Sequence, residues 1–223
     1  SNELNPQCFI DTANMLFDLL VEISKQLNIK FEFINLGGGI GIPHKPEEKA
    51  VDLEIVSKKI KENYQKKIVE NGLAPLKIIM ECGRLITGPH GYLVSTVRHI
   101  TKKYKNFVGL DSCMADFMRP GIYKAYHHIS VLGKENIPSD HIYDITGSLC
   151  ENNDKFAIDR PLPKIETGDI LALHDAGAHG RAMGFNYNGK LRCKELLLKE
   201  NGEIELIRRA EIENDYFSTL SFP

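Results

Sequence analysis

Three consecutive glycines, Gly37-Gly38-Gly39, directly follow a short apolar run at residues 31–36. Glycine has no Cβ, so the chain can turn there with positive φ and bring its N–H groups close to a ligand. A strand that ends in such a turn presents several N–H donors, an arrangement suited to a phosphate. An ordinary tight loop needs the same residues. The glycines alone therefore leave a phosphate site and a plain turn equally open.

A second candidate for chemistry is the pair Arg119 and Tyr123. Residues four apart lie on the same side of a helical turn. A carboxylate ligand favours arginine, because the planar guanidinium can donate two parallel hydrogen bonds to it. Without further motifs, a structural or surface arginine is the simpler interpretation of Arg119.

Cys150 and Glu151 form a third candidate. A thiol, with an ordinary pKa near ~8.5, can exchange a proton close to neutral pH. The neighbouring carboxylate can bind a substrate ammonium group. An isolated cysteine is more often a small buried apolar residue. That interpretation is preferred for the other four cysteines, Cys8, Cys82, Cys113 and Cys193.

Composition narrows the class of protein. The 223 residues include 28 basic and 30 acidic ones, a net charge of −2, so no broad field favours nucleic acid or an anionic membrane as partner. The five cysteines have neither CxxC spacing nor a compact framework, which predicts reduced thiols in a cytoplasm. No apolar run approaches the ~20 residues that span a bilayer. We therefore expect a soluble cytoplasmic protein.

The first part of the chain predicts alternating helices and strands. A helix capped by Asp11 has apolar residues three and four apart up to Leu27, and a strand over residues 31–36 follows. A second helix over residues 51–71 ends at Gly72, before a strand over residues 76–80. This order is typical of a parallel sheet, in which functional groups collect at the carboxyl ends of the strands. Both the glycine turn and Glu81-Cys82-Gly83-Arg84 lie at such ends, which favours the phosphate interpretation.

After Gly91 the pattern changes to short apolar runs separated by polar turns, which predicts an antiparallel barrel or sandwich. The predicted strands cover residues 92–100, 107–110, 127–132, 141–146, 170–174, 191–198 and 203–208. Asn201-Gly202, between two such runs, is a strong hairpin signal. We therefore divide the chain into an α/β domain at residues 1–91 and a β-domain at residues 92–223. Only about two βα units precede the boundary, too few to close a barrel of eight.

Histidines and lysines cluster in two places without suggesting further chemistry. His127-His128 and the pair His174 and His179 lack the spacing of a metal-ligand set, because alternate strand positions face opposite ways. We therefore expect no metal site. The lysine-rich run at residues 58–67 has apolar residues at helical spacing and is most simply a solvated helix face.

Taken together, the motifs resemble one family. Five of them occur in the order found in fold-type III pyridoxal-phosphate-dependent decarboxylases, and most closely in the diaminopimelate decarboxylases. They are Gly37-Gly38-Gly39, Glu81-Cys82-Gly83-Arg84, Met118-Arg119-Pro120-Gly121-Ile122-Tyr123, Gly147-Ser148-Leu149-Cys150-Glu151 and Asn186-Tyr187-Asn188. The family usually has proline where this chain has Cys82.

The resemblance implies a fold and a missing part. The fold class is α/β plus all-β: the carboxy-terminal part of a pyridoxal-phosphate-binding (β/α)8 barrel of the alanine-racemase type, followed by an antiparallel β-barrel or sandwich. The resemblance covers essentially the whole chain, but only part of the family's length. In the family, the first strands of the barrel and the Schiff-base lysine lie before the segment that matches Ser1. We therefore expect the chain alone to be inactive, and either to need a partner fragment or to be poorly soluble.

The resemblance also implies roles for individual residues. The glycine turn and Tyr187 would contact the cofactor phosphate, and Glu81 would face the pyridine nitrogen and keep it protonated. Gly83 and Arg84 belong to the cofactor loop, and Arg84 would contact the phosphate or the substrate carboxylate. Cys150 would return a proton to the product carbon. Three further residues are expected to contact the substrate. These substrate contacts are Arg119 and Tyr123 for the distal carboxylate and Glu151 for an ammonium group.

The implied reaction is the pyridoxal 5'-phosphate-dependent decarboxylation of meso-diaminopimelate to L-lysine and CO2, the last step of lysine biosynthesis. In the family, the segment matching Cys150-Glu151 reaches into the site of a second subunit, so a homodimer is expected. Two alternatives stay open. One is a related decarboxylase that acts on carboxynorspermidine or a basic amino acid, and the other is a truncated, non-catalytic module that dimerises or binds a ligand.

Overall fold

The structure, a computed structural model, describes residues 2–221. It contains two compact units, Ser1–Pro89 and His90–Pro223. No helix within the described range is long and apolar enough to cross a membrane. All five cysteines are free thiols.

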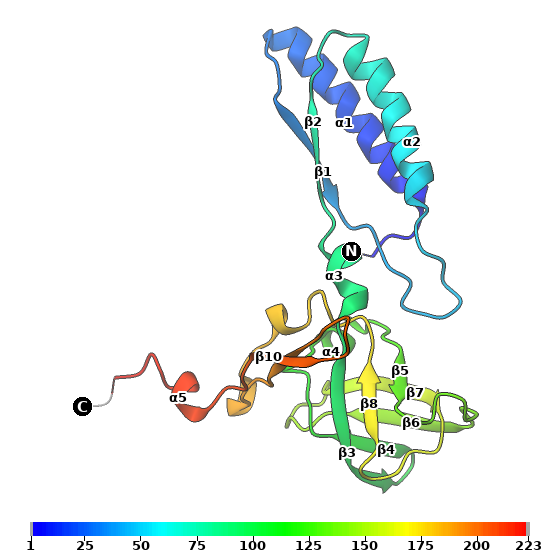
Figure 1. The fold of residues 1–223 in the computed structure, drawn as a ribbon, viewed down its shortest axis with the longest axis vertical. Helices are drawn as coiled ribbons and strands as arrows, with labels where there is room; N and C mark the ends of the chain where they lie inside the picture. The colour runs from blue at the N-terminus through cyan, green and yellow to red at the C-terminus, as the bar shows by residue number, and fades with distance from the viewer. Residues whose placement is uncertain (1, 222–223) are drawn as a thin grey trace. The chain divides into compact units, whose positions relative to one another are not determined.

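Unit 1 is a two-stranded parallel sheet with two long helices on one face (Figure 1). Its elements, in chain order, are α1 (Pro6–Leu27), β1 (Phe33–Gly38), α2 (Leu53–Tyr64), the π-helical extension η1 (Gln65–Val69), β2 (Lys77–Glu81), α3 (Gly83–Thr87) and the short turn η2 (Gly88–His90). The apolar faces of α1 and α2 form the core with Leu36 and Leu76. Burial of the helices against the sheet therefore aligns the carboxyl ends of β1 and β2 side by side.

The beginning of α1 differs from the prediction. The helix starts at Pro6, not after Asp11, and Asn5 is its N-cap, accepting a hydrogen bond from the Gln7 N–H. Asparagine at the N-cap and proline at the first helical position are both favoured, because proline has no N–H to satisfy there. Asp11 instead lies inside the helix and accepts a hydrogen bond from Gln7.

Unit 2 is built on a six-stranded sheet in the order β5-β8-β3-β4-β6-β7, which curves around its own core (Figure 1). Its elements are β3 (Leu93–Lys102), β4 (Asn106–Leu110), α4 (Arg119–Tyr123), β5 (Ile129–Val131), β6 (His141–Thr146), β7 (Lys155–Leu162), β8 (Ile170–Leu173), η3 (Arg181–Met183), η4 (Tyr187–Gly189), β9 (Glu195–Leu198), β10 (Ile204–Arg208) and α5 (Glu213–Tyr216). The fold class inferred from the sequence is confirmed.

Two features of this sheet depart from the prediction. The pair β4 and β6 is parallel, whereas the other pairs are antiparallel. A parallel pair needs a long crossover, and here residues 111–140 supply it and contain α4. Strand β7 was absent from the predicted set, because its charged residues and Pro161 obscure the apolar pattern. It lies at the end of the sheet, where proline is tolerated.

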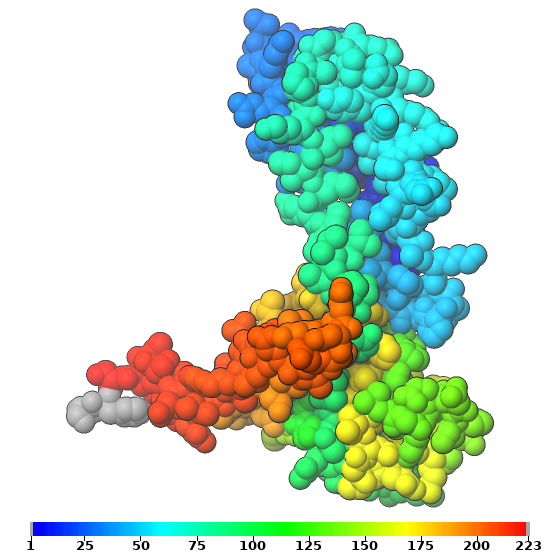
Figure 2. Space-filling view, viewed as in Figure 1, coloured from blue at the N-terminus to red at the C-terminus, as the bar shows by residue number. Residues whose placement is uncertain are grey.

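The predicted hairpin is formed by β9 and β10, with Gly202 at φ 85° in the turn. Its two strands pair with each other alone. Their aliphatic side chains are exposed and form part of the surface drawn in orange in Figure 2. These side chains are Leu196, Leu197, Leu198, Ile204, Leu206 and Ile207.

Candidate functional site

At the glycine turn, the backbone of unit 1 lies close to a neighbouring strand. Gly37 and Gly39 have φ of 75° and 86°, a left-handed conformation that favours glycine. Gly38 pairs with Glu81 across the parallel sheet. A Cβ on Gly38 would lie 2.0 Å from the carbonyl oxygen of Glu81, so only glycine fits there. The turn therefore needs glycine for two different reasons.

Glu81 ends strand β2, and its carboxylate is oriented by a residue of β1. Asn35 donates a hydrogen bond from Nδ2 to Oε1 of Glu81 at 2.6 Å, and its Oδ1 accepts one from the Gly37 N–H at 2.8 Å. One carboxamide thus joins the glycine turn to the carboxylate. The motifs did not single out Asn35. The available signal was a polar residue inside an apolar strand, two positions before the glycines.

Immediately after β2, Cys82 precedes the short helix α3. Partial burial raises the pKa of the Cys82 thiol above its ordinary value, which disfavours a reactive thiolate. Gly83 begins α3, and Arg84 is buried within the unit's described residues. The two motifs predicted for the cofactor phosphate and ring therefore lie on adjacent strand ends of unit 1.

In unit 2, α4 holds Arg119 and Tyr123 on one short helix, as their spacing predicted. Arg119 is half-buried, and burial lowers the pKa of its guanidinium. Its Nε donates a hydrogen bond to Nε2 of His127, at 3.4 Å. No carboxylate in residues 2–221 forms an ion pair with Arg119. A partly desolvated cation without a counter-ion is costly, and it is suited to an anionic ligand.

The loop that contains Cys150 and Glu151 is anchored by the buried residue Asp154. The two carboxylate oxygens of Asp154 accept hydrogen bonds from the Met114 N–H and the Leu149 N–H, each at 2.7 Å. Burial nevertheless raises the pKa of Asp154 above its ordinary value. The Cys150 side chain is exposed, whereas Glu151 is partly buried. The loop is therefore fixed through its backbone, and the thiol faces outward.

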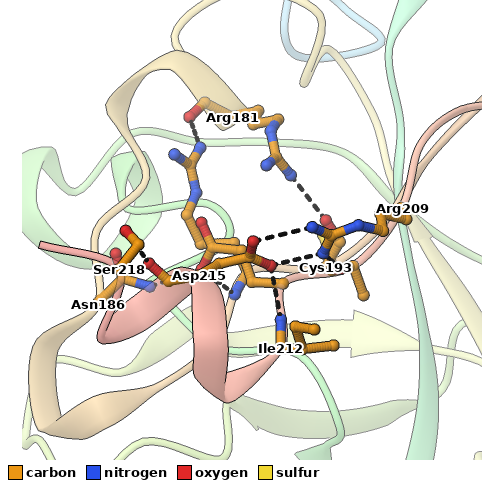
Figure 3. Close-up of polar contacts among 10 residues, drawn as sticks. Arg181, Asn186, Cys193, Arg209, Ile212, Asp215 and Ser218 are labelled. Carbon is orange, nitrogen blue, oxygen red and sulfur yellow. Dashed lines mark hydrogen bonds and ion pairs between the residues drawn. The ribbon is translucent and has the colours of Figure 1, made fainter.

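The Tyr187 segment packs against that loop. Asn188 donates a hydrogen bond to the carbonyl oxygen of Cys150 at 3.0 Å, and Lys190 donates one to Oγ of Ser148 at 2.7 Å. The same segment is tied to the carboxy-terminal part of the chain by Asn186, which donates to Glu211 at 2.7 Å. In that part of the chain, Asp215 accepts hydrogen bonds from Arg209 and from the Ile212 N–H (Figure 3). The Tyr187 side chain itself is exposed.

Helix α4 also contacts the Cys150 loop. A Cβ on Gly121 would lie 2.5 Å from the carbonyl oxygen of Asn153, so the helix backbone is close to the loop. Lys124 donates a hydrogen bond to Oδ1 of the same asparagine at 3.4 Å. Unit 2 thus gathers three of the five motifs on neighbouring segments, and unit 1 holds the other two.

The match to a known family spans most of the chain. Residues 20–177 match the family described as "Pyridoxal-dependent decarboxylase, C-terminal sheet domain". The chain belongs to this family. Among individual relatives, the chain is 42% identical to "Protein TabA" of Pseudomonas amygdali pv. tabaci, over 97% of this chain and 50% of that protein. It is 35% identical to the diaminopimelate decarboxylase of Methanothermobacter thermautotrophicus, over 100% of this chain and 52% of that protein.

Solved structures of family members agree. The diaminopimelate decarboxylase from M. jannaschii superposes with a TM-score of 0.90 at 33% identity, covering 100% of this chain and 50% of that one. The enzyme from Helicobacter pylori, complexed with L-lysine, gives a TM-score of 0.84 at 32% identity, covering 98% and 52%. The chain therefore spans about half the length of the relatives it matches.

Proposed function

We propose that this chain supplies the phosphate, pyridinium and substrate contacts of a pyridoxal 5'-phosphate-dependent diaminopimelate decarboxylase. The reaction converts meso-diaminopimelate to L-lysine and CO2. The observation that supports this substrate most directly is Arg119, a half-buried guanidinium without a carboxylate counter-ion among the described residues. The names of the relatives point to the same substrate.

The residues of unit 1 fit the cofactor. Gly37 and Gly39 turn the backbone with positive φ, and the space beside Gly37 is open, which suits a phosphate near backbone N–H groups. Glu81, held by Asn35, is an acceptor suited to a protonated ring nitrogen. When bound, the cofactor supplies the electron sink that makes loss of CO2 feasible. Arg84 would contact the phosphate or the substrate carboxylate.

Unit 2 supplies the remaining groups. Arg119 and Tyr123 bind the distal carboxylate of the substrate, and Glu151 binds its ammonium group. Cys150 returns a proton to the carbon that has lost CO2, and Tyr187 contributes its hydroxyl to the phosphate. The cofactor-binding lysine comes from outside this chain, so residues 1–223 alone are expected to be inactive.

The wider setting is also a proposal. We expect a homodimer in which Cys150 and Glu151 complete the site of the second subunit, and sedimentation of the full-length protein tests this. We place the enzyme in the cytoplasm, because its five cysteines are all free thiols.

Substitution of Arg119 tests the substrate assignment in the full-length protein. Arg119→Ala is expected to raise KM for diaminopimelate by about 10- to 100-fold, because charge-assisted hydrogen bonds are lost. Cofactor binding should stay unchanged. Arg119→Lys is the matched control and should recover part of the effect, since it restores the charge without the planar fork. Equal KM values for wild type and Arg119→Ala would sink the assignment.

A substrate panel separates the alternatives. Diaminopimelate, carboxynorspermidine, lysine, ornithine and arginine are supplied in turn, and CO2 release is measured. A free guanidinium at Arg119 disfavours a substrate with a cationic tail, so diaminopimelate should be preferred. The panel is needed because this chain is more similar in sequence to Protein TabA, at 42% identity, than to the Methanothermobacter decarboxylase, at 35% identity. No CO2 from any member of the panel would support a non-catalytic module.

A further inference from the structure

His127 lies between α4 and β5 and is fully buried. Its Nδ1 is 2.9 Å from the backbone carbonyl oxygen of His174, the residue that follows β8. The ring of Phe117 packs against the imidazole edge-on, with centroids 4.5 Å apart. The imidazole is therefore held in position by two neighbouring segments of unit 2.

The hydrogen bonds define which ring nitrogen has the proton. A carbonyl oxygen only accepts, so Nδ1 of His127 must be the protonated nitrogen. On the other side of the ring, the Nε–H of Arg119 points at Nε2 at 3.4 Å, so Nε2 must accept. Both contacts are satisfied together by a neutral imidazole in the Nδ1–H form, which accepts from the arginine through the lone pair of Nε2.

This contact has a stereochemical consequence for Arg119. A guanidinium can bind a carboxylate through Nε and one terminal nitrogen, or through both terminal nitrogens. His127 occupies Nε, so the terminal pair is the edge left for a bidentate ligand. Because the partner is a neutral imidazole and not a carboxylate, the positive charge of the guanidinium is not neutralised.

A second arginine reinforces the arrangement. Arg160 donates a hydrogen bond from Nη1 to the backbone carbonyl oxygen of His127 at 2.9 Å. Its guanidinium also lies over the ring of Tyr126, 4.0 Å from the centroid. Arg160 of β7 therefore fixes the backbone of His127, whereas the residue that follows β8 fixes its imidazole.

We propose that His127 is a positioning residue that holds Arg119 with its terminal nitrogens and its charge available to the distal carboxylate of the substrate. This inference rests on the proposed function. It assigns no chemical step to His127, which acts through Arg119 alone. The residue type matters, since an apolar side chain leaves Nε unpaired and an acidic one neutralises the charge.

The test compares three variants of the full-length enzyme: His127→Leu, which removes the acceptor, His127→Gln, which keeps one, and His127→Glu, which adds a negative charge. The readouts are inhibition by L-lysine, which has the distal carboxylate, and by cadaverine, which lacks it. His127→Leu should weaken inhibition by L-lysine about tenfold and leave inhibition by cadaverine unchanged. His127→Gln should retain most of the inhibition by L-lysine that His127→Leu loses. His127→Glu should weaken inhibition by L-lysine the most.

The controls separate this inference from the proposed function. His141→Leu, at a histidine that is paired with Asp140 at the start of β6, should leave inhibition by both compounds unchanged. If Arg119→Ala also leaves inhibition by L-lysine unchanged, the substrate assignment fails. If Arg119→Ala weakens inhibition by L-lysine and His127→Leu does not, only the positioning role is overturned. An equal loss for both inhibitors would indicate a purely structural role and would also overturn it.

A measurement without substitution covers the case in which the variants do not fold. The imidazole ¹⁵N shifts of His127, in the full-length enzyme labelled at histidine, report the protonated nitrogen directly. A neutral ring with the proton on Nδ1 is expected. A proton on Nε2, in either the neutral or the doubly protonated form, would exclude the hydrogen bond from Arg119 and contradict the proposal.

Discussion

At the scale of single residues, Asn35 makes two hydrogen bonds in opposite directions. It donates to the carboxylate of Glu81 and accepts from the N–H of Gly37. Neither contact could be predicted from the order of the motifs, because each joins Asn35 to a group whose position depends on how β1 pairs with β2. The glycines and Glu81 could be predicted as a group, since both lie at the carboxyl ends of strands. The amide that joins them required the register of the sheet.

Asn35→Ala removes both of these hydrogen bonds. In the full-length enzyme it should weaken cofactor binding about tenfold, because the glycine turn and Glu81 are no longer tied together. Asn35→Asp should be worse, since it places a second carboxylate beside Glu81. Titration with pyridoxal 5'-phosphate, followed by the absorbance of the bound cofactor, measures the effect. Asn71→Ala, at an exposed residue of unit 1 away from the turn, is the control and should bind as wild type.

The same limit applies to Arg119 and His127. Their spacing of eight residues predicts no contact, because the chain leaves the helical conformation at Lys124. The pairing depends on where β8 places the carbonyl of His174. The spacing of the histidines in the sequence is not that of a metal-ligand set, and it does not indicate that one of them contacts the arginine.

At the scale of elements, the sequence predicted strands and helices well where the apolar period was clear. The helix at residues 51–71 is present as α2 and its extension η1, with Gly72 at φ 71° after it. The start of α1 was misplaced at Asp11, because Asn5 caps the helix and Pro6 begins it. Strand β7 was missed because a strand at the end of a sheet tolerates charge and proline.

The loop between β6 and β7 depends on Asp154. Asp154→Asn leaves one oxygen acceptor for two N–H donors and turns an NH2 group toward one of them. The free energy of unfolding should fall by about 1–3 kcal/mol, measured by denaturation in urea. Asp140→Ser, at an exposed residue, is the matched surface control, and its effect on the free energy of unfolding is expected to be near zero.

The difference in unfolding free energy between wild type and Asp154→Asn depends on pH, and its direction follows from the pKa of Asp154. Burial raises the pKa of Asp154 above the ordinary 3.8, so the folded chain takes up the proton before the unfolded chain does. The resulting stabilisation is fully present below the ordinary pKa and is lost as the pH rises through the folded value. The gap in unfolding free energy between wild type and Asp154→Asn should therefore be wider in mild acid than at neutral pH. A gap that narrows in acid would contradict this sign.

At the scale of the whole molecule, each unit leaves apolar surface uncovered. On the parallel sheet the exposed side chains include Phe33, Ile78, Ile79 and Met80, and the β9–β10 hairpin exposes aliphatic residues on both strands. Exposed apolar surface and unpaired strand edges favour association. The relatives are about twice as long as this chain, and we propose that the sheet of unit 1 packs against the part of the family fold that the chain does not match.

We therefore expect the isolated 223-residue chain to bind a hydrophobic dye and to self-associate at micromolar concentration. Coexpression with the amino-terminal half of a family member should reduce both. Dye fluorescence and sedimentation velocity measure the two effects, and Ile79→Lys should lower dye binding without restoring a complex. A monomeric chain that binds no dye would show that these surfaces need no partner.

The contact between Gly38 and the carbonyl of Glu81 has a consequence for cofactor choice. Because no side chain separates the two strand ends, the backbone sets the spacing between the glycine turn and the end of β2, and Asn35 then fixes the Glu81 carboxylate relative to that turn. A cofactor that uses both groups must have its phosphate and its ring nitrogen at that one separation. Discrimination against unphosphorylated forms of vitamin B6 would then originate in the sheet itself.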